Sequence, residues 1–194
     1  MIYTNLKARE NKLHGLFESS ALLSTDVGKL YDAIVRDEND TAIEVDNGVA
    51  IHIGDYTGEG LQERYATIAT AKEKIAVTGS PADVKSALTT AEAQAYNYTN
   101  TAGKAAKAYQ IQDADVHEDI FGVAQYQFTD DSADKVKVGN AVVVDGKGAW
   151  VADEAANIDT LKGTNGFVGK IHSISYGTYY NIVRIEVVQN KDIA

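Results

Sequence analysis

Residues 167–188 read FVGKIHSISYGTYYNIVRIEVV, two strand-like runs joined by a turn rich in glycine and tyrosine. In the second run, Val183, Ile185 and Val187 alternate with Arg184 and Glu186. A period of two is typical of a strand with one buried face and one wet face. This stretch therefore indicates a β-rich binding or structural module rather than an enzyme.

Further short strands precede this stretch, and glycine turns separate several of them. The turn at 46–48, Asp-Asn-Gly, lies between two apolar alternating runs, and Asn-Gly supplies the positive φ angles of a tight turn, so it predicts a hairpin. A second turn is predicted at 145–148. The other expected strands are residues 64–70, 74–78, 107–112, 119–128, 141–144, 149–152, 168–175 and 180–189. Short strands at this spacing predict a mainly β fold built from small β-barrel or β-sandwich modules.

One short α-helix is expected at about 81–95. Ser80 suits the N-cap, Pro81 suits the first helical position, and apolar residues then recur at helical spacing. The polar stretch 96–104 breaks this pattern. We therefore predict an extended N-terminal arm at 1–20, a first β module with the helix at 21–102, and a C-terminal barrel or sandwich at 103–194. Whether the two β modules share one core stays open.

Composition restricts the classes of function. The 194 residues include no cysteine and carry a net charge of −10. An acidic surface is repelled by phosphate backbones and anionic lipid, so nucleic acid and membranes are not expected as partners. No basic-then-apolar leader and no apolar run of membrane-spanning length is present in the sequence, so we expect a soluble protein made in a cytoplasm.

No complete catalytic or metal motif stands out. The four histidines lie far apart and none has a partner at metal-ligand spacing. The acidic stretch from Asp37 lacks the glycine and the bidentate glutamate of a calcium loop, and the glycine-rich segment at 163–170 has the wrong spacing for a phosphate loop. We expect no enzyme activity, no cofactor and no metal. A hydrolase using two carboxylates is the weakest alternative, because no spacing singles out a pair.

The N-terminal arm holds more large apolar residues than a solvated tail needs, and it is mildly basic on an acidic chain. A flexible terminus is one interpretation. We favour an extended segment that lies on a partner, where such arms commonly add a strand to an open sheet edge. The expected contact residues are Ile2, Tyr3, Leu6, Lys7, Arg9, Leu13, Leu16 and Phe17.

Tyrosine is the most frequent aromatic residue, with eleven tyrosines against four phenylalanines and one tryptophan. Tyrosines at turns can bind sugars or proteins, because the ring packs while the hydroxyl forms a hydrogen bond. They also simply suit half-buried strands, and both interpretations stay open. The residues of a glycan site would be Tyr176, Tyr179 and Tyr180.

Several segments together resemble a family of small structural proteins of tailed bacteriophages, encoded beside the major capsid protein and taken to decorate the head. The matching segments agree in order and spacing over about residues 40–188, and the arm is not covered. They are EKIAVTGSP (73–81), AGKAAKAY (102–109), VHEDIFGV (116–123), VGNAVVVDG (138–146), FVGKI (167–171) and TYYNIVRIEV (178–187). These motifs are structural, and the family has no catalytic residues to transfer.

The resemblance implies a non-enzymatic capsid decoration (cement) protein that binds the outer surface of a phage head and stabilises it. The implied partner is the major capsid protein and the implied location is the virion surface. Shell symmetry favours self-association, with a trimer as one option, although nothing in the sequence fixes the number of copies. The alternative is a fibre-like or adhesin-like virion module that binds host glycans through its tyrosine-rich turns.

Overall fold

The computed structural model describes residues 15–19, 30–58, 63–79, 99–115, 119–177 and 180–194. The protein is mainly β, as predicted, and its strands form a closed barrel, a six-stranded sheet and a two-stranded ribbon. The expected helix at 81–95 lies outside the described residues. A short helical segment that the sequence did not predict runs through η4 (Ala155–Asn157) and α2 (Ile158–Lys162).

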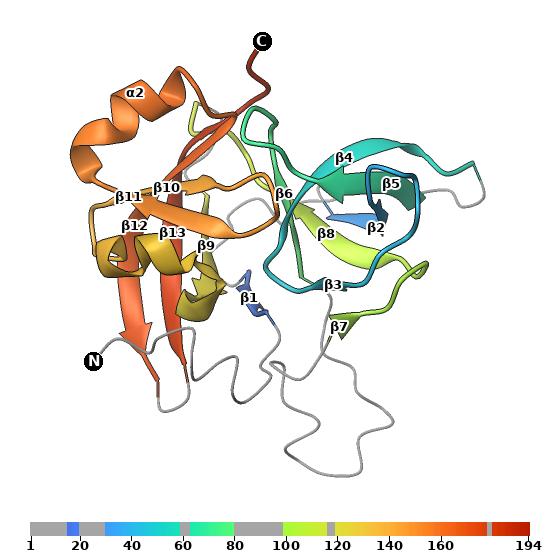
Figure 1. Ribbon diagram of the computed structural model, residues 1–194, viewed down its shortest axis with the longest axis horizontal. Coiled ribbons are helices and arrows are strands. Elements are labelled where there is room, and N and C mark those ends of the chain that lie inside the picture. Colours follow the sequence, from blue (N-terminus) through green and yellow to red (C-terminus); the bar gives the residue numbers. More distant parts are fainter. Residues whose placement is uncertain (1–14, 20–29, 59–62, 80–98, 116–118, 178–179) are drawn as a thin grey trace.

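The barrel occupies the right-hand side of Figure 1 and closes in the order β2-β5-β4-β6-β8. Only β2 and β5 run parallel, and the other neighbours are antiparallel. Its strands are β2 (Leu30–Arg36), β4 (Ala50–Tyr56), β5 (Glu63–Ile68), β6 (Ala76–Thr78) and β8 (Ala106–Gln110). Because β8 completes it, the barrel extends beyond the boundary predicted at 102.

The interior of the barrel is filled mainly by small side chains. Ala33, Ala66, Ala76 and Ala108 are buried there together with a few larger aliphatic residues. Because barrel diameter grows with the number of strands, a five-stranded barrel has a narrower interior than an eight-stranded one. The alanine-rich strands therefore suit a narrow barrel.

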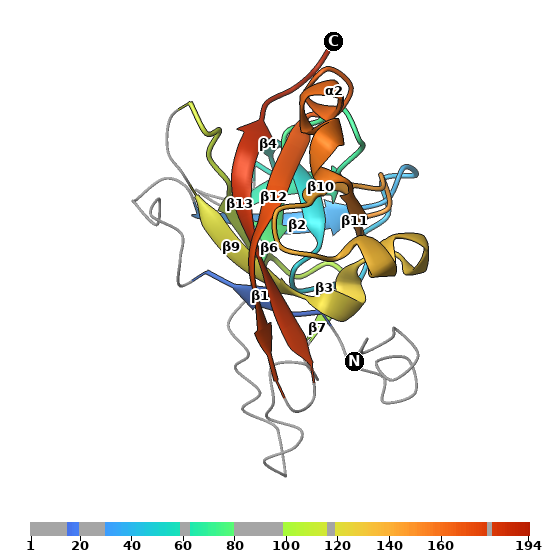
Figure 2. The same ribbon diagram turned by 90° about the vertical axis from the view of Figure 1, so that its left-hand side faces the viewer.

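The six-stranded sheet is entirely antiparallel, in the order β1-β9-β13-β12-β10-β11; it lies beside the barrel in Figure 1 and in front of it in Figure 2. Its strands are β1 (Phe17–Glu18), β9 (Ile120–Ala124), β10 (Ala141–Val144), β11 (Trp150–Asp153), β12 (Phe167–Tyr176) and β13 (Asn181–Asn190). The 3-10 helices η2 (Gln125–Gln127) and η3 (Asp130–Lys135) follow β9. The strand predicted at 119–128 therefore ends early, at Ala124.

The hairpin of β12 and β13 confirms the alternation in the sequence. Val183, Ile185 and Val187 are buried, whereas Arg184 and Glu186 are only half-buried. The turn at 145–148 also joins paired strands, because β10 and β11 are antiparallel neighbours and Asp145 Oδ1 accepts hydrogen bonds from the N–H groups of Lys147 and Ala149.

The hairpin predicted at 46–48 is wrong. Gly48 has the expected positive φ of 77°, but β3 (Val45–Asp46) pairs with β7 (Thr99–Asn100) and not with β4. The reason is that side chains distant in sequence form hydrogen bonds with the main-chain carbonyls of the turn. The Trp150 indole N–H donates to the Gly48 carbonyl (2.9 Å), and Gln127 Nε2 donates to the Asn47 carbonyl (3.0 Å).

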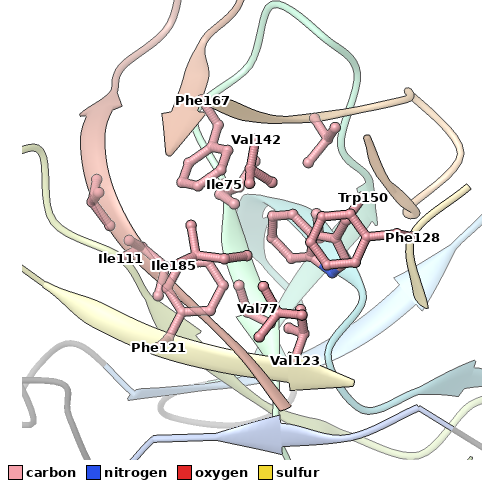
Figure 3. Close-up of a cluster of buried hydrophobic side chains, with 14 of the residues drawn as sticks. Ile75, Val77, Ile111, Phe121, Val123, Phe128, Val142, Trp150, Phe167 and Ile185 are labelled. Atoms are coloured by element: carbon pink, nitrogen blue, oxygen red, sulfur yellow. The ribbon is translucent and has the colours of Figure 1, made fainter. Parts of the chain in front are cut away.

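One hydrophobic cluster is shared between the outside of the barrel wall and the six-stranded sheet, and a second, separate cluster fills the barrel interior. Strand β6 is the common wall, because Ala76 faces the barrel interior while Ile75 and Val77 pack against sheet residues such as Phe121. Figure 3 shows these side chains in one cluster with Trp150. Removing this apolar surface from water supplies the main free energy that holds the two halves together.

Asn190, at the end of β13, ties the two halves through buried hydrogen bonds. Its Oδ1 accepts from the Ile75 N–H (2.7 Å), and its Nδ2 donates to the carbonyls of Ile75 (2.9 Å) and Ile111 (2.8 Å). The side chain therefore satisfies main-chain groups of the barrel that water cannot reach.

Candidate functional site

The segment Gly15–Ser19, here called the anchored segment, is the described end of the predicted arm, and it is fixed to the body by several independent contacts. Phe17 and Glu18 form β1, which pairs antiparallel with Val123 and Gly122 of β9. The Leu16 N–H donates to Gln127 Oε1 at 2.9 Å. A two-residue strand has little stability alone, so side-chain contacts must hold this segment in place.

The Phe17 ring makes the main apolar contact. Its centroid lies 5.0 Å from the Tyr109 ring and 6.1 Å from the Phe121 ring, in tilted arrangements that aromatic pairs prefer. Tyr109 belongs to the barrel and Phe121 to the sheet, so Phe17 packs across both halves.

The Glu18 carboxylate makes the main polar contact. Arg184 Nε donates to Glu18 Oε2 (2.8 Å) and Arg184 Nη2 donates to Glu18 Oε1 (3.0 Å), a two-bond pairing of the kind that arginine geometry favours. Arg184 Nη1 also donates to Ser175 Oγ at 2.7 Å. The hydrogen bond with Glu18 raises the pKa of Arg184, since it favours the charged guanidinium.

Glycines leave the space that the anchored segment occupies. A Cβ atom on Gly79 would lie less than 3 Å from the Phe17 ring, one on Gly122 less than 3 Å from Glu18, and one on Gly48 less than 3 Å from the Leu16 carbonyl. Such distances are shorter than side chains tolerate, so larger residues at these positions would displace the segment.

Two residues of the predicted contact set, Leu16 and Phe17, lie in the anchored segment. Leu16 is 9% exposed and the half-buried Phe17 packs on the core, so both side chains contact the body of this chain. The other expected contact residues, Ile2, Tyr3, Leu6, Lys7, Arg9 and Leu13, lie outside the described residues. Sequence reasoning missed the residues that hold the segment: Glu18, Gln127 and Arg184.

The tyrosine-rich turn adjoins a hollow on the surface of the six-stranded sheet, here called the Tyr176 hollow. Tyr176 is 79% exposed at its rim, and Gln125, Asp134, Lys137 and Asn181 line it together with Ala133, Val136 and Ile174. Tyr180 is half-buried and does not line this hollow, and Tyr179 lies outside the described residues. The predicted tyrosine cluster is therefore represented here by Tyr176 alone.

Asn181 is the best-defined polar group of the Tyr176 hollow. It is 2% exposed, and its Nδ2 donates to Gln125 Oε1 at 2.8 Å. Its Oδ1 is buried without a hydrogen-bond partner in the described part of the protein. An unsatisfied buried acceptor is costly, so a ligand donor or a water at this atom would stabilise the fold.

The described residues contain neither a metal-binding cluster nor a membrane-spanning helix. They hold no group of three or more His, Cys, Asp or Glu side chains arranged to bind a metal ion. Two of the four histidines are described: His52 contacts the Lys74 carbonyl and His172 lies beside Glu186. His14 and His117 lie outside the described residues. Within the same ranges, no helix has the length and apolar character needed to cross a bilayer.

Comparison of this chain with protein-family models, with curated proteins and with solved structures finds no match in any of the three.

Proposed function

We propose that this protein is a non-enzymatic virion component that binds the outer surface of a phage capsid through residues 1–14 and stabilises the shell. The resemblance of residues 40–188 to phage head decoration proteins supports this proposal. The observation that carries the role of the arm is the anchored segment, whose strand pairing, Phe17 packing and Glu18–Arg184 ion pair fix the point where residues 1–14 join the body.

The fixed position of the anchored segment matters because an arm that becomes ordered on a partner loses conformational entropy. Arm residues that order on a partner lose conformational freedom, at about 1–2 kcal/mol per residue for the backbone. If residues 15–19 were not held on the body, ordering them would add to this cost. Retention on a capsid is further helped when many copies, or an oligomer such as a trimer, bind together.

Co-sedimentation with purified capsids of the source virus tests the proposal. The full chain is compared with a variant that lacks residues 1–14 and keeps the anchored segment. We expect the full chain to saturate the shell and the truncated chain to stay in the supernatant while it keeps its far-UV circular dichroism. Undiminished binding by the folded truncated chain would refute the role of the arm.

The second candidate function is glycan binding at the Tyr176 hollow. An exposed aromatic ring beside buried amides and charged groups is a combination that packs on a sugar face and bonds its hydroxyls. Binding on a glycan array that is lost in Tyr176→Ala would support it, and Tyr56→Ala, at another exposed tyrosine, is the matched control. A blank array with the full chain would remove this candidate.

A further inference from the structure

The clearest further feature is a hollow at one end of the barrel, here called the Arg64 pocket. It is lined by Tyr31, Ile53, Arg64, Lys74, Ile75, Ala76 and Gln110 and has a volume of about 90 Å³. Its two charged lining residues are both cations, although the chain as a whole carries a net charge of −10. A basic hollow on an otherwise acidic protein creates a local positive electrostatic potential that attracts an anionic group.

Arg64 differs from the other arginines that the structure describes. Arg36 pairs with Asp40 at 2.7 Å and Arg184 pairs with Glu18 at 2.8 Å, whereas Arg64 makes no ion pair with any described residue. Its Nη1 donates a hydrogen bond to the Gly54 carbonyl at 3.1 Å, and its buried Nε has no partner among the described residues. A half-buried guanidinium without an anion keeps unused donors.

Two tyrosine rings hold the Arg64 guanidinium in a defined orientation. Its Cζ lies 3.9 Å from the Tyr56 ring centroid and 5.0 Å from the Tyr31 ring centroid. When rings contact the face of a guanidinium, its N–H donors still point outward in its plane, and a carboxylate can bind at that edge. The site is thus organised before any ligand arrives, which lowers the cost of binding.

The remaining polar groups of the pocket are also suited to an anion. Lys74 Nζ forms an ion pair with Asp192 Oδ2 at 3.7 Å, which is longer than a hydrogen bond, and both side chains are about half exposed, so a ligand carboxylate would compete with Asp192 for this cation. Gln110 uses its Oε1 to accept from the Tyr31 hydroxyl at 2.9 Å, which leaves its amide N–H groups as donors. The apolar walls formed by Ile53, Ile75 and Ala76 suit a carbon-bearing anion better than a fully hydrated one.

We propose that the Arg64 pocket binds a carboxylate group, carried either by a small organic acid or by an acidic side chain of a protein partner. Arg64 would bind the carboxylate edge to edge, with Lys74 as the second cation. This proposal does not depend on capsid binding by residues 1–14, because the pocket lies in the barrel and uses other residues.

Titration of the full chain with sodium glutarate, followed by NMR of the arginine side-chain N–H groups at constant ionic strength, tests the proposal. Glutaramide is the uncharged control ligand, sodium phosphate tests the alternative anion, and an acetylated Glu-Glu dipeptide amide represents the protein source. We expect saturable shifts of the Arg64 signal with glutarate or the dipeptide, and none with glutaramide. The tighter of the two carboxylates identifies the source.

Three variants complete the experiment. Because Arg64→Gln removes the Arg64 signal, binding to the variants is followed through the backbone N–H signals of the pocket residues Tyr31 and Ala76. Arg64→Gln should weaken carboxylate binding about tenfold or more, as loss of a charge-assisted hydrogen bond predicts. Lys74→Gln, at a half-exposed position where folding is safe, should weaken it several-fold. Arg36→Gln, whose arginine already has a partner, should leave it unchanged. Absence of saturable shifts, tighter binding of phosphate, or equal affinities in all three variants would each overturn the proposal.

Discussion

Replacement of Asn190 by alanine should destabilise the whole protein, because this one side chain joins the barrel to the six-stranded sheet. The variant removes three buried hydrogen bonds, two with the main chain of Ile75 and one with that of Ile111. At about 1–1.5 kcal/mol for each bond, the free energy of unfolding should fall by about 3–4.5 kcal/mol. That is a large part of the 5–15 kcal/mol typical of a domain.

Urea unfolding followed by tryptophan fluorescence is the appropriate assay, since the only tryptophan, Trp150, is fully buried in the shared core. Asn190→Ala should lower the midpoint and keep a single transition, while Asn39→Ala, at an exposed turn, should not move it. A decrease in unfolding free energy below about 1 kcal/mol would refute the role of Asn190 in joining barrel and sheet. Separate fluorescence and circular dichroism transitions in the unaltered chain would show that the two halves unfold independently, which would also refute it.

Three further predictions concern the anchored segment and the alkaline limit of stability. Phe17→Ala should lower the free energy of unfolding by about 2 kcal/mol in urea denaturation, because the half-buried ring leaves both Tyr109 and Phe121; an unchanged midpoint would contradict this. Glu18→Gln should cost about 1 kcal/mol, and the loss should shrink in high salt; a loss that is independent of salt would contradict the ion pair. Burial raises the pKa of Tyr126, so its neutral form stabilises the fold fully below the unfolded pKa of about 10 and this stability is lost as the pH rises further. Tyr126→Phe should therefore flatten the alkaline decrease in unfolding free energy, and an equal slope in both proteins would contradict the assignment.

The fold class and most strands could be predicted because their signals are local. The alternation from Asn181 to Asn190 and the glycine turn at 145–148 each specify a neighbour close in sequence. Strand β2 escaped prediction because its buried positions include the small Ala33, which gives little hydrophobic contrast. The narrow barrel, which favours such residues, is a property of five distant strands together.

The candidate site depended on contacts that no local pattern shows. Glu18 and Arg184 meet across 166 positions of sequence, and Gln127 reaches both Leu16 and the turn at Asn47. The Asn-Gly turn therefore has the predicted backbone angle but the wrong strand partner. The apolar character of Leu16 and Phe17 was a valid signal of burial, but the surface that buries them is this chain's own.

Counting the copies of this protein that bind to each purified capsid tests the proposed function most directly. Saturation at a number commensurate with the shell symmetry, lost on removal of residues 1–14 and kept in Tyr176→Ala, is the result that the account predicts. No binding, or a few copies at a single vertex, would contradict a decoration role and favour the glycan-binding alternative at the Tyr176 hollow.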